Sequence, residues 1–254
     1  MELWDTHCHL NDPSFAGRTD EILVRAQTVG VCKIVVPAYD MASIRRTWAL
    51  ASDYPATVLP AIGLHPWFIG DEQQWDGLSR EIQRPECRAV GEIGVDGYAG
   101  SPPKALQMWW FERQLELAVE LKLPALIHCR RAFPELLRVL KRFRGAAGLI
   151  LHAFAGSPEL ARQLVRLGAY ISFAGALTLD NARKALAVAL VVPEDRLLLE
   201  TDAPSIGLNH VPAPEVEPAH LLRIAQRLAQ VRGCGVADIA RISTENARRV
   251  FGGS

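Results

Sequence analysis

Eight short apolar runs alternate with helical patterns along the whole of this 254-residue chain. The runs are rich in Val, Ile and Leu and show little polar–apolar alternation, as is typical of parallel strands covered on both faces. We expect strands at 2–6, 33–37, 57–62, 88–93, 125–128, 149–152, 169–173 and 196–201. Eight strand–helix units in about 250 residues predict an α/β fold of the (β/α)8 TIM-barrel type.

The segments between the expected strands carry apolar residues at helical spacing. We expect helices at 19–28, 42–52, 72–83, 104–121, 133–142, 158–167, 179–190, 220–232 and 236–251. Pro134 and Pro158 are suitably placed for the first turns of their helices. A doubly wound open sheet is the alternative fold, but no G-x-G-x-x-G follows the first strand and no P-loop motif occurs. Segment 205–218, which holds three prolines, is predicted to be a long loop, so residues 1–254 are expected to form one barrel domain.

Charge and cysteine content narrow the class of protein. The chain has 28 basic and 28 acidic side chains, which argues against a broadly basic protein that coats nucleic acid. Five widely spaced cysteines without a C-x-x-C motif predict neither a disulfide framework nor a structural zinc site. We find no signal-peptide pattern and no apolar run long enough to span a membrane. These features predict a cytoplasmic protein without membrane association.

Metal-ligand side chains recur at the carboxyl ends of the expected strands. In a barrel these ends share one rim, where the active site lies. Residues two apart in a strand point to the same side, so both histidines of the first strand end can face the barrel axis while Cys8 faces the helices. Burying so many polar groups without a ligand would be costly. We therefore predict a metal site formed by His7, His9, Glu92, His128, His152 and Asp202.

The remaining histidines have competing interpretations. His65 follows the third expected strand, and it can either serve the site or simply make a hydrogen bond within its own loop. His210 and His220 lie outside the strand pattern and are expected to be ordinary loop histidines. Arg130 and Arg131 after the fifth strand are the best candidates for phosphate contact, although a solvated helix start would also explain them.

Six sequence blocks carry a family resemblance. They are DTHCHL (5–10), IGLHP (62–66), GEIGVD (91–96), IHCR (127–130), HAFAG (152–156) and ETDAP (200–204). In this order they resemble the TatD family of metal-dependent hydrolases over the whole chain, and the second and fifth blocks look most like its YjjV-like branch. The resemblance implies a TIM barrel with one to three divalent metals and hydrolysis of DNA phosphodiester bonds.

The resemblance also implies roles for individual residues. His7, His9, Glu92 and Asp202 would hold one metal, and Glu92, His128 and His152 would hold a second, with Glu92 bridging the two. Many binuclear amidohydrolases bridge their metals with a carboxylated lysine on strand four or five, but no lysine lies near either strand end here. The chain departs from typical nuclease members at two places. Segment 203–222 has no Lys or Arg, and Gly97 stands where many relatives have an aromatic residue.

Together these observations predict a phosphodiesterase that binds two divalent metal ions. The candidate metals are Zn, Mn and Mg. We expect catalytic roles for Asp202, Glu92 and His65, with Asp202 orienting the attacking water and accepting its proton. His65 or Arg130 would bind the substrate and neutralise charge on its phosphate. The expected partner is a DNA end or a small phosphoester, with no stable protein partner and a monomeric state. The alternatives are an amidohydrolase acting on a C–N or carboxyl-ester bond and a barrel kept only for binding.

Overall fold

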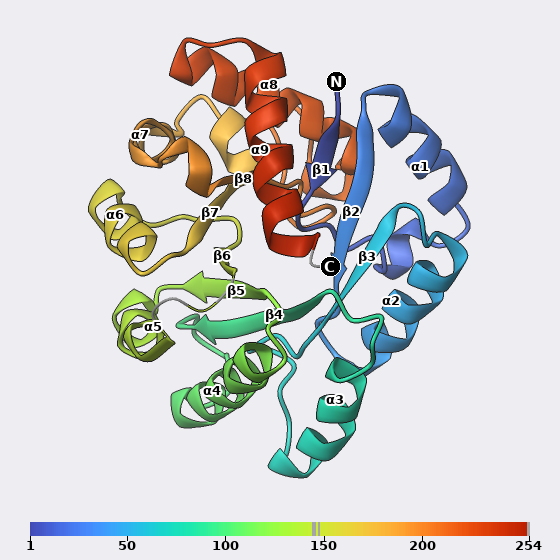
Figure 1. The fold of residues 1–254 in the computed structure, drawn as a ribbon, viewed down its shortest axis with the longest axis vertical. Helices are drawn as coiled ribbons and strands as arrows, with labels where there is room; N and C mark the ends of the chain where they lie inside the picture. The colour runs from blue at the N-terminus through green and yellow to red at the C-terminus, as the bar shows by residue number, and fades with distance from the viewer. Residues whose placement is uncertain (144–145, 147, 253–254) are drawn as a thin grey trace.

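The computed structural model describes residues 1–143, 146 and 148–252 (Figure 1). In this part of the chain, eight parallel strands form one sheet in sequence order. They are β1 (Leu3–Asp5), β2 (Val31–Pro37), β3 (Val58–Ile62), β4 (Ala89–Asp96), β5 (Ala125–Arg130), β6 (Leu149–Leu151), β7 (Tyr170–Phe173) and β8 (Leu197–Leu199). Each strand overlaps the run predicted for it, and the TIM-barrel prediction is confirmed.

Hydrogen bonds around Thr6 bring the last strand back to the first. The backbone N–H and the hydroxyl of Thr6 both donate to the carbonyl of Leu199, at 3.0 and 2.9 Å. Just beyond them, the carboxylate of Asp5 accepts from the backbone N–H and the hydroxyl of Thr201, at 3.0 and 2.6 Å. The two strand ends are therefore joined by side chains as well as backbone, and the barrel is nearly closed.

Helices surround the strands in the expected alternation (Figure 1). They are α1 (Thr19–Thr28), α2 (Met41–Asp53), α3 (Trp75–Ile82), α4 (Lys104–Glu120), α5 (Phe133–Leu140), α6 (Pro158–Arg166), α7 (Arg183–Val191), α8 (Leu221–Arg232) and α9 (Val236–Phe251). Pro134 and Pro158 lie in first turns, as predicted. In the described residues no helix combines the length and the apolarity needed to cross a membrane.

Two predicted helix starts are wrong. The first turn of the segment predicted at 72–83 is a 3-10 helix, Glu72–Gln74, and α3 begins only at Trp75. The helix predicted from residue 179 begins at Arg183, because Leu179 has an extended backbone after a 3-10 turn, Gly175–Thr178. The hydroxyl of Thr178 accepts from the N–H of Asn209, at 2.8 Å, so a distant loop holds this segment.

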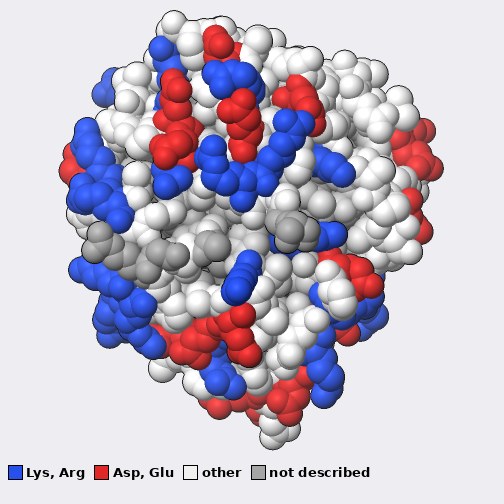
Figure 2. Space-filling view, in the orientation of Figure 1, with Lys and Arg blue, Asp and Glu red and all other residues white. Residues whose placement is uncertain are grey.

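The end of the barrel that carries the amino termini of the strands is closed by α9, which crosses the centre of Figure 1. One inward-facing side chain from each strand forms a buried layer with Ala247 and Phe251 of α9. The layer contains Trp4, Val35, Ala61, Ala89, Leu126, Ile150, Tyr170 and Leu198. Figure 2 shows basic and acidic side chains interspersed on this face. The opposite end, at the carboxyl ends of the strands, is the one left open.

The long loop between β8 and α8 is folded rather than extended. It contains two 3-10 turns, Ala213–Glu215 and Pro218–His220, and it buries Leu208 and Val216. Glu217 accepts from the Arg25 guanidinium of α1 at 2.8 Å, through both of its oxygens. The loop predicted at 205–218 is thereby confirmed and is anchored to the outside of the barrel.

Candidate metal centre

The structure brings the six predicted ligands together at the open end of the barrel. His7 and His9 follow β1, Glu92 lies in β4, His128 lies in β5, and His152 and Asp202 follow β6 and β8. His65, after β3, joins the same group. A cavity of about 370 Å³ opens above them, within the size range of small-molecule sites. It is lined by His9, Asp12, Tyr39, His65, Trp67, Phe68, Glu92, His128, His152, Asp202 and Ser205.

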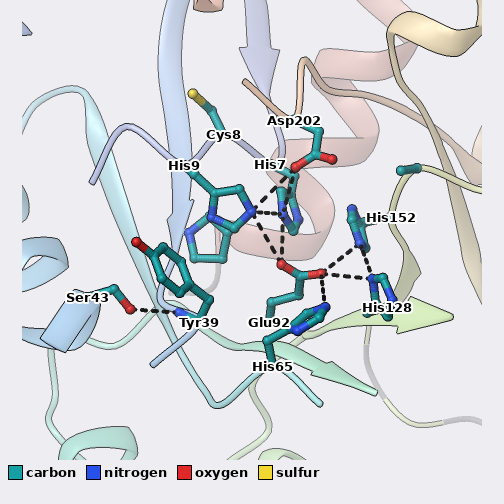
Figure 3. A network of polar contacts seen from close by, with 12 residues as sticks. His7, Cys8, His9, Tyr39, Ser43, His65, Glu92, His128, His152 and Asp202 are labelled. Atoms are coloured by element: carbon teal, nitrogen blue, oxygen red, sulfur yellow. Dashed lines mark hydrogen bonds and ion pairs between the residues drawn. The ribbon is translucent and has the colours of Figure 1, made fainter. Parts of the chain in front are cut away.

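One group of donor atoms lies on the β1 and β8 side (Figure 3). The Nε2 atoms of His7 and His9 are 3.3 Å apart, and each lies 3.4 Å from Oε2 of Glu92. The Oδ1 atom of Asp202 lies 3.5 Å from His7 and 3.4 Å from His9. Two imidazoles and two carboxylates therefore direct one donor atom each toward a common point.

A second group lies on the β5 and β6 side (Figure 3). The other oxygen of Glu92, Oε1, lies 2.9 Å from Nε2 of His152 and 3.1 Å from Nδ1 of His128. Those two nitrogens are 3.2 Å apart. His65 approaches from the rim, with its Nε2 atom 3.6 Å from Oε1. Glu92 thus presents one oxygen to each group and lies between them.

Backbone hydrogen bonds hold the first group in place. Although β1 ends at Asp5, the segment from Thr6 to His9 still forms hydrogen bonds with both of its neighbours in the barrel. The N–H of Cys8 donates to Val35 of β2 at 3.0 Å, and the N–H of Asp202 donates to His7 at 2.9 Å. Cys8 is buried on the side opposite the two histidines, as predicted. Asp202 itself has a φ of 51°, so it lies in a turn after β8 and not at the strand end we expected.

Carboxylates that sequence reasoning missed support the second group. Asp96 Oδ2 lies 2.9 Å from Nε2 of His128 and turns the Nδ1 atom of that ring toward Glu92. Glu200 Oε1 lies 3.4 Å from Nδ1 of His152 and accepts from the N–H of Ala153 at 2.6 Å. Carboxylates that bind the second nitrogen of a ligating histidine orient the ring and raise its basicity. Glu200 follows β8 and meets His152 only in the folded barrel, so no local signal in the sequence reveals its role.

The close approach of β4 to β5 depends on a glycine. Gly94 has a φ of 144°, and a Cβ atom there would lie 2.0 Å from the carbonyl oxygen of His128. A side chain at this position would push β5 away and move the His128 ring, so the glycine keeps this ring next to Glu92.

The close packing of the cluster shifts the pKa values of its side chains. Burial raises the pKa of the Glu92 carboxyl, but the neighbouring His152 and His128 outweigh burial and lower that pKa well below its usual range. Burial lowers the pKa of His9, yet its contacts with Asp202 and Glu92 raise it to about 10. The pKa of His152 is raised in the same way by Glu92 and Glu200, against the effect of burial. The buried imidazoles and carboxylates of the cluster therefore stabilise one another's charged forms.

The residues fit divalent metal ions. Asp202 Oδ1 is buried and has no hydrogen-bond partner, although it points at two imidazole nitrogens. The donor set contains only imidazole nitrogen and carboxylate oxygen, which suits Zn²⁺ or Mn²⁺. Three sets of donor atoms lie close enough to hold an ion: His7 with His9 and Asp202, His7 with Glu92 and His152, and His65 with Glu92 and His128.

The two residues predicted to bind substrate have different surroundings. His65 is buried, and burial lowers its pKa to about 3. Its Nδ1 atom accepts from the N–H of Trp67 at 3.1 Å, so the proton of the neutral ring is on Nε2. His65 therefore offers a hydrogen bond rather than the positive charge we expected. Arg130 is exposed at the rim outside the cavity, and its guanidinium lies 4.5 Å from the centre of the Tyr98 ring.

The histidines expected to be unrelated to the site are indeed separate from it. His210 is exposed in the loop after β8. His220 Nδ1 accepts from the N–H of Glu217 at 3.1 Å and so caps a 3-10 turn.

Comparison with known proteins identifies the family. The family model described as TatD related DNase matches residues 4–252. The chain belongs to the TatD family. It is 35% identical to the uncharacterized metal-dependent hydrolase YabD of Bacillus subtilis, over 98% of each chain. It is 30% identical to the human deoxyribonuclease TATDN3, over 98% of this chain and 94% of that one.

A solved structure from the TatD family has the same fold. The crystal structure of YjjV, a TatD homologue from Escherichia coli K12, superposes with a TM-score of 0.93 at 34% identity. The superposition covers 99% of this chain and 98% of that one. The chain is thus a TatD-family metal-dependent hydrolase with a TIM-barrel fold, and its buried His, Glu and Asp clusters indicate a binuclear metal site.

Proposed function

We propose that this chain is a binuclear phosphodiesterase that cleaves DNA from an end or hydrolyses a small phosphoester. The observation that carries the proposal is the position of Glu92, whose two oxygens face two separate histidine groups at 2.9–3.4 Å. Two-metal sites of this kind are common in phosphatases and nucleases. The names of the family and of the human relative, which mention DNA cleavage, support the same reaction.

The proposed ligands divide between the two groups. His7, His9, Asp202 and Oε2 of Glu92 would hold one ion, and Oε1 of Glu92, His128 and His152 would hold the other. Bound divalent ions would lower the pKa of water and stabilise negative charge on phosphate oxygens. Asp96 keeps the ligating nitrogen of His128 directed inward, and Glu200 places a carboxylate 3.4 Å from the outer nitrogen of His152.

Two side chains are assigned to the reaction itself. Asp202 lines the cavity beside the first group, and its carboxylate would orient the attacking water and accept its proton. Burial raises the pKa of the Asp202 carboxyl, but the neighbouring histidines outweigh burial and lower that pKa. The carboxylate is therefore ionised and able to accept a proton. The Nε2–H of His65 would donate a hydrogen bond to a phosphate oxygen.

A hydrolysis screen tests the proposal. Protein loaded with Mn²⁺ or Zn²⁺ should cleave single-stranded DNA or a simple phosphodiester much faster than carboxyl esters or amides. The Glu92→Ala variant, run in parallel, should lose that activity and so exclude a contaminating nuclease. Turnover restricted to esters or amides would refute the proposal.

The second candidate is an amidohydrolase-type enzyme with a small substrate. It is favoured by the loop after Asp202, in which segment 203–222 holds Glu215 and Glu217 but no Lys or Arg. Such a loop is poorly suited to holding a long polyanion. The same screen separates the two candidates.

A further inference from the structure

Aromatic side chains gather at the mouth of the metal centre with their rings in solvent. Trp67, Phe68 and Tyr98 are 44%, 49% and 47% exposed. They are three of the eight large apolar side chains that are exposed in the part of the chain that the structure describes. The other five are scattered over the chain, so this concentration of exposed rings at one site points to a ligand.

These rings continue outward from the metal centre. His65 lies 5.3 Å from Trp67 and 6.0 Å from Phe68, between ring centres. Phe68 lies 5.4 Å from Tyr39, and Trp67 lies 6.2 Å from Tyr98. We call Tyr39, Trp67, Phe68 and Tyr98 the aromatic wall. Because Tyr39, Trp67 and Phe68 line the cavity itself, a group held at the metal centre would lie next to the wall.

Backbone contacts fix the wall relative to the site. The N–H of Trp67 donates to His65 Nδ1, and the N–H of Phe68 donates to the His65 carbonyl at 2.9 Å. The N–H of Tyr98 donates to Asp96 Oδ1 at 2.7 Å, and the other oxygen of Asp96 contacts His128. The same residues that shape the metal centre therefore position the rings, and little ordering is needed when a ligand binds.

Basic side chains lie at both ends of the aromatic wall. The Arg130 guanidinium lies over the Tyr98 ring, 4.5 Å from its centre. At the other end of the wall, the Arg46 guanidinium donates to the Tyr39 hydroxyl at 2.8 Å. A phosphate chain that leaves the metal centre along the wall is therefore attracted by a positive charge at either end.

We propose that the aromatic wall binds the nucleobase next to the bond that is cleaved, so that the preferred substrate is a nucleotide ester and not a simple phosphodiester. This inference rests on the proposed phosphodiesterase function. Every base has a flat apolar face, and stacking on aromatic rings is largely independent of sequence. The wall would supply the affinity that the nearly neutral chain cannot obtain from phosphate contacts.

Equilibrium binding tests this inference without relying on turnover. Calorimetry with Mn²⁺-loaded protein compares thymidine 5′-monophosphate with 2-deoxyribose 5-phosphate, which has no base. The nucleotide should bind roughly 5- to 100-fold more tightly, the range expected for one stacked base. Trp67→Leu, which removes the aromatic face but keeps an apolar side chain, should bring this ratio close to one. Trp67→Phe should retain most of it.

Two further variants make the result decisive. Tyr98→Leu should also lower the affinity ratio. This second variant keeps the inference testable if Trp67→Leu misfolds. Leu190→Ala in α7 removes a side chain that is 65% exposed and lies far from the mouth. This control should leave the affinity ratio unchanged. Equal affinities of the wild-type protein for the two ligands would overturn the inference, and so would an unchanged ratio in both leucine variants.

The outcome is separable from that of the proposed function. If the wild-type protein cleaves neither base-containing nor base-free phosphodiesters, the proposed function fails. A base-dependent binding ratio that responds to Trp67→Leu would still establish the aromatic wall as a base-binding surface.

Discussion

The substitution Asp96→Asn tests how the second histidine group is held. Asp96 is 1% exposed, and its Oδ2 atom lies 2.9 Å from Nε2 of His128. Its Oδ1 atom accepts from the N–H of Tyr98 at 2.7 Å. That backbone donor would hold the amide oxygen of an asparagine in the Oδ1 position. The amide NH₂ would then face Nε2 of His128, and two donors would oppose each other.

The histidine can relieve this conflict only by moving its proton. If Nε2 gives up its hydrogen and accepts from the amide, the proton of the neutral ring is on Nδ1. Nδ1 is the atom that faces Glu92, so the lone pair needed for a metal is lost. Loss of such a supporting contact costs ~10–100-fold in metal affinity, or about 1.4–2.7 kcal/mol. Because this contact is short and buried, we expect an effect in the upper half of that range.

Metal titration by calorimetry measures the effect. The site weakened most should be the one formed by His128, His152 and Glu92, because it contains the ring that Asp96 contacts. The exposed Asp195, which pairs with Arg196 at 3.4 Å, provides a matched control in Asp195→Asn. If Asp96→Asn bound both ions as tightly as the control, the tautomer argument would be refuted.

The other predictions concern the bridge, proton release, DNA and the barrel. Glu92→Ala should lose both metals and all activity. Asp202→Asn should retain at least one metal, and its single-turnover rate should fall by roughly 10²–10⁴-fold. Metal analysis and rapid-quench assays distinguish the two variants. The pKa of His9 is raised to about 10, and a metal can bind only to the neutral ring, so binding must displace the proton of His9. Metal affinity should therefore fall as pH is lowered from 8 to 6, by about tenfold per pH unit for each such proton. Binding of single-stranded DNA should have a log–log salt slope of about −2 or shallower, since few phosphates are neutralised; a steep slope with tight binding to long duplexes would contradict this. Gly94→Ala should lower thermal stability and metal content together, because its Cβ would collide with the His128 carbonyl.

The barrel could be predicted because its signal is local. Each apolar run, such as that of β2 or β7, reports burial on both faces without knowledge of its neighbours. The start of α7 could not be predicted from local sequence, since Thr178 and Asp180, just before the helix, both form hydrogen bonds with the distant Asn209. Local patterns thus define elements, and distant contacts define where some of them begin.

The residues of the site also fall into those that local sequence identifies and those that it does not. The histidines and Glu92 were identifiable because strand ends converge in any barrel. Asp96 and Glu200 were not identified, because their partners depend on the register between neighbouring strands: His128 pairs with Gly94, two residues before Asp96. The neutral state of His65 was also invisible, since it follows from burial in the folded chain.

Anomalous scattering from crystals soaked in Mn²⁺ or Zn²⁺ tests the central claim most directly. One ion should lie on each side of the Glu92 carboxylate. One should contact His7, His9 and Asp202, and the other should contact His128 and His152. No ion at these side chains, or a single ion that leaves one oxygen of Glu92 without a metal, would contradict the binuclear assignment.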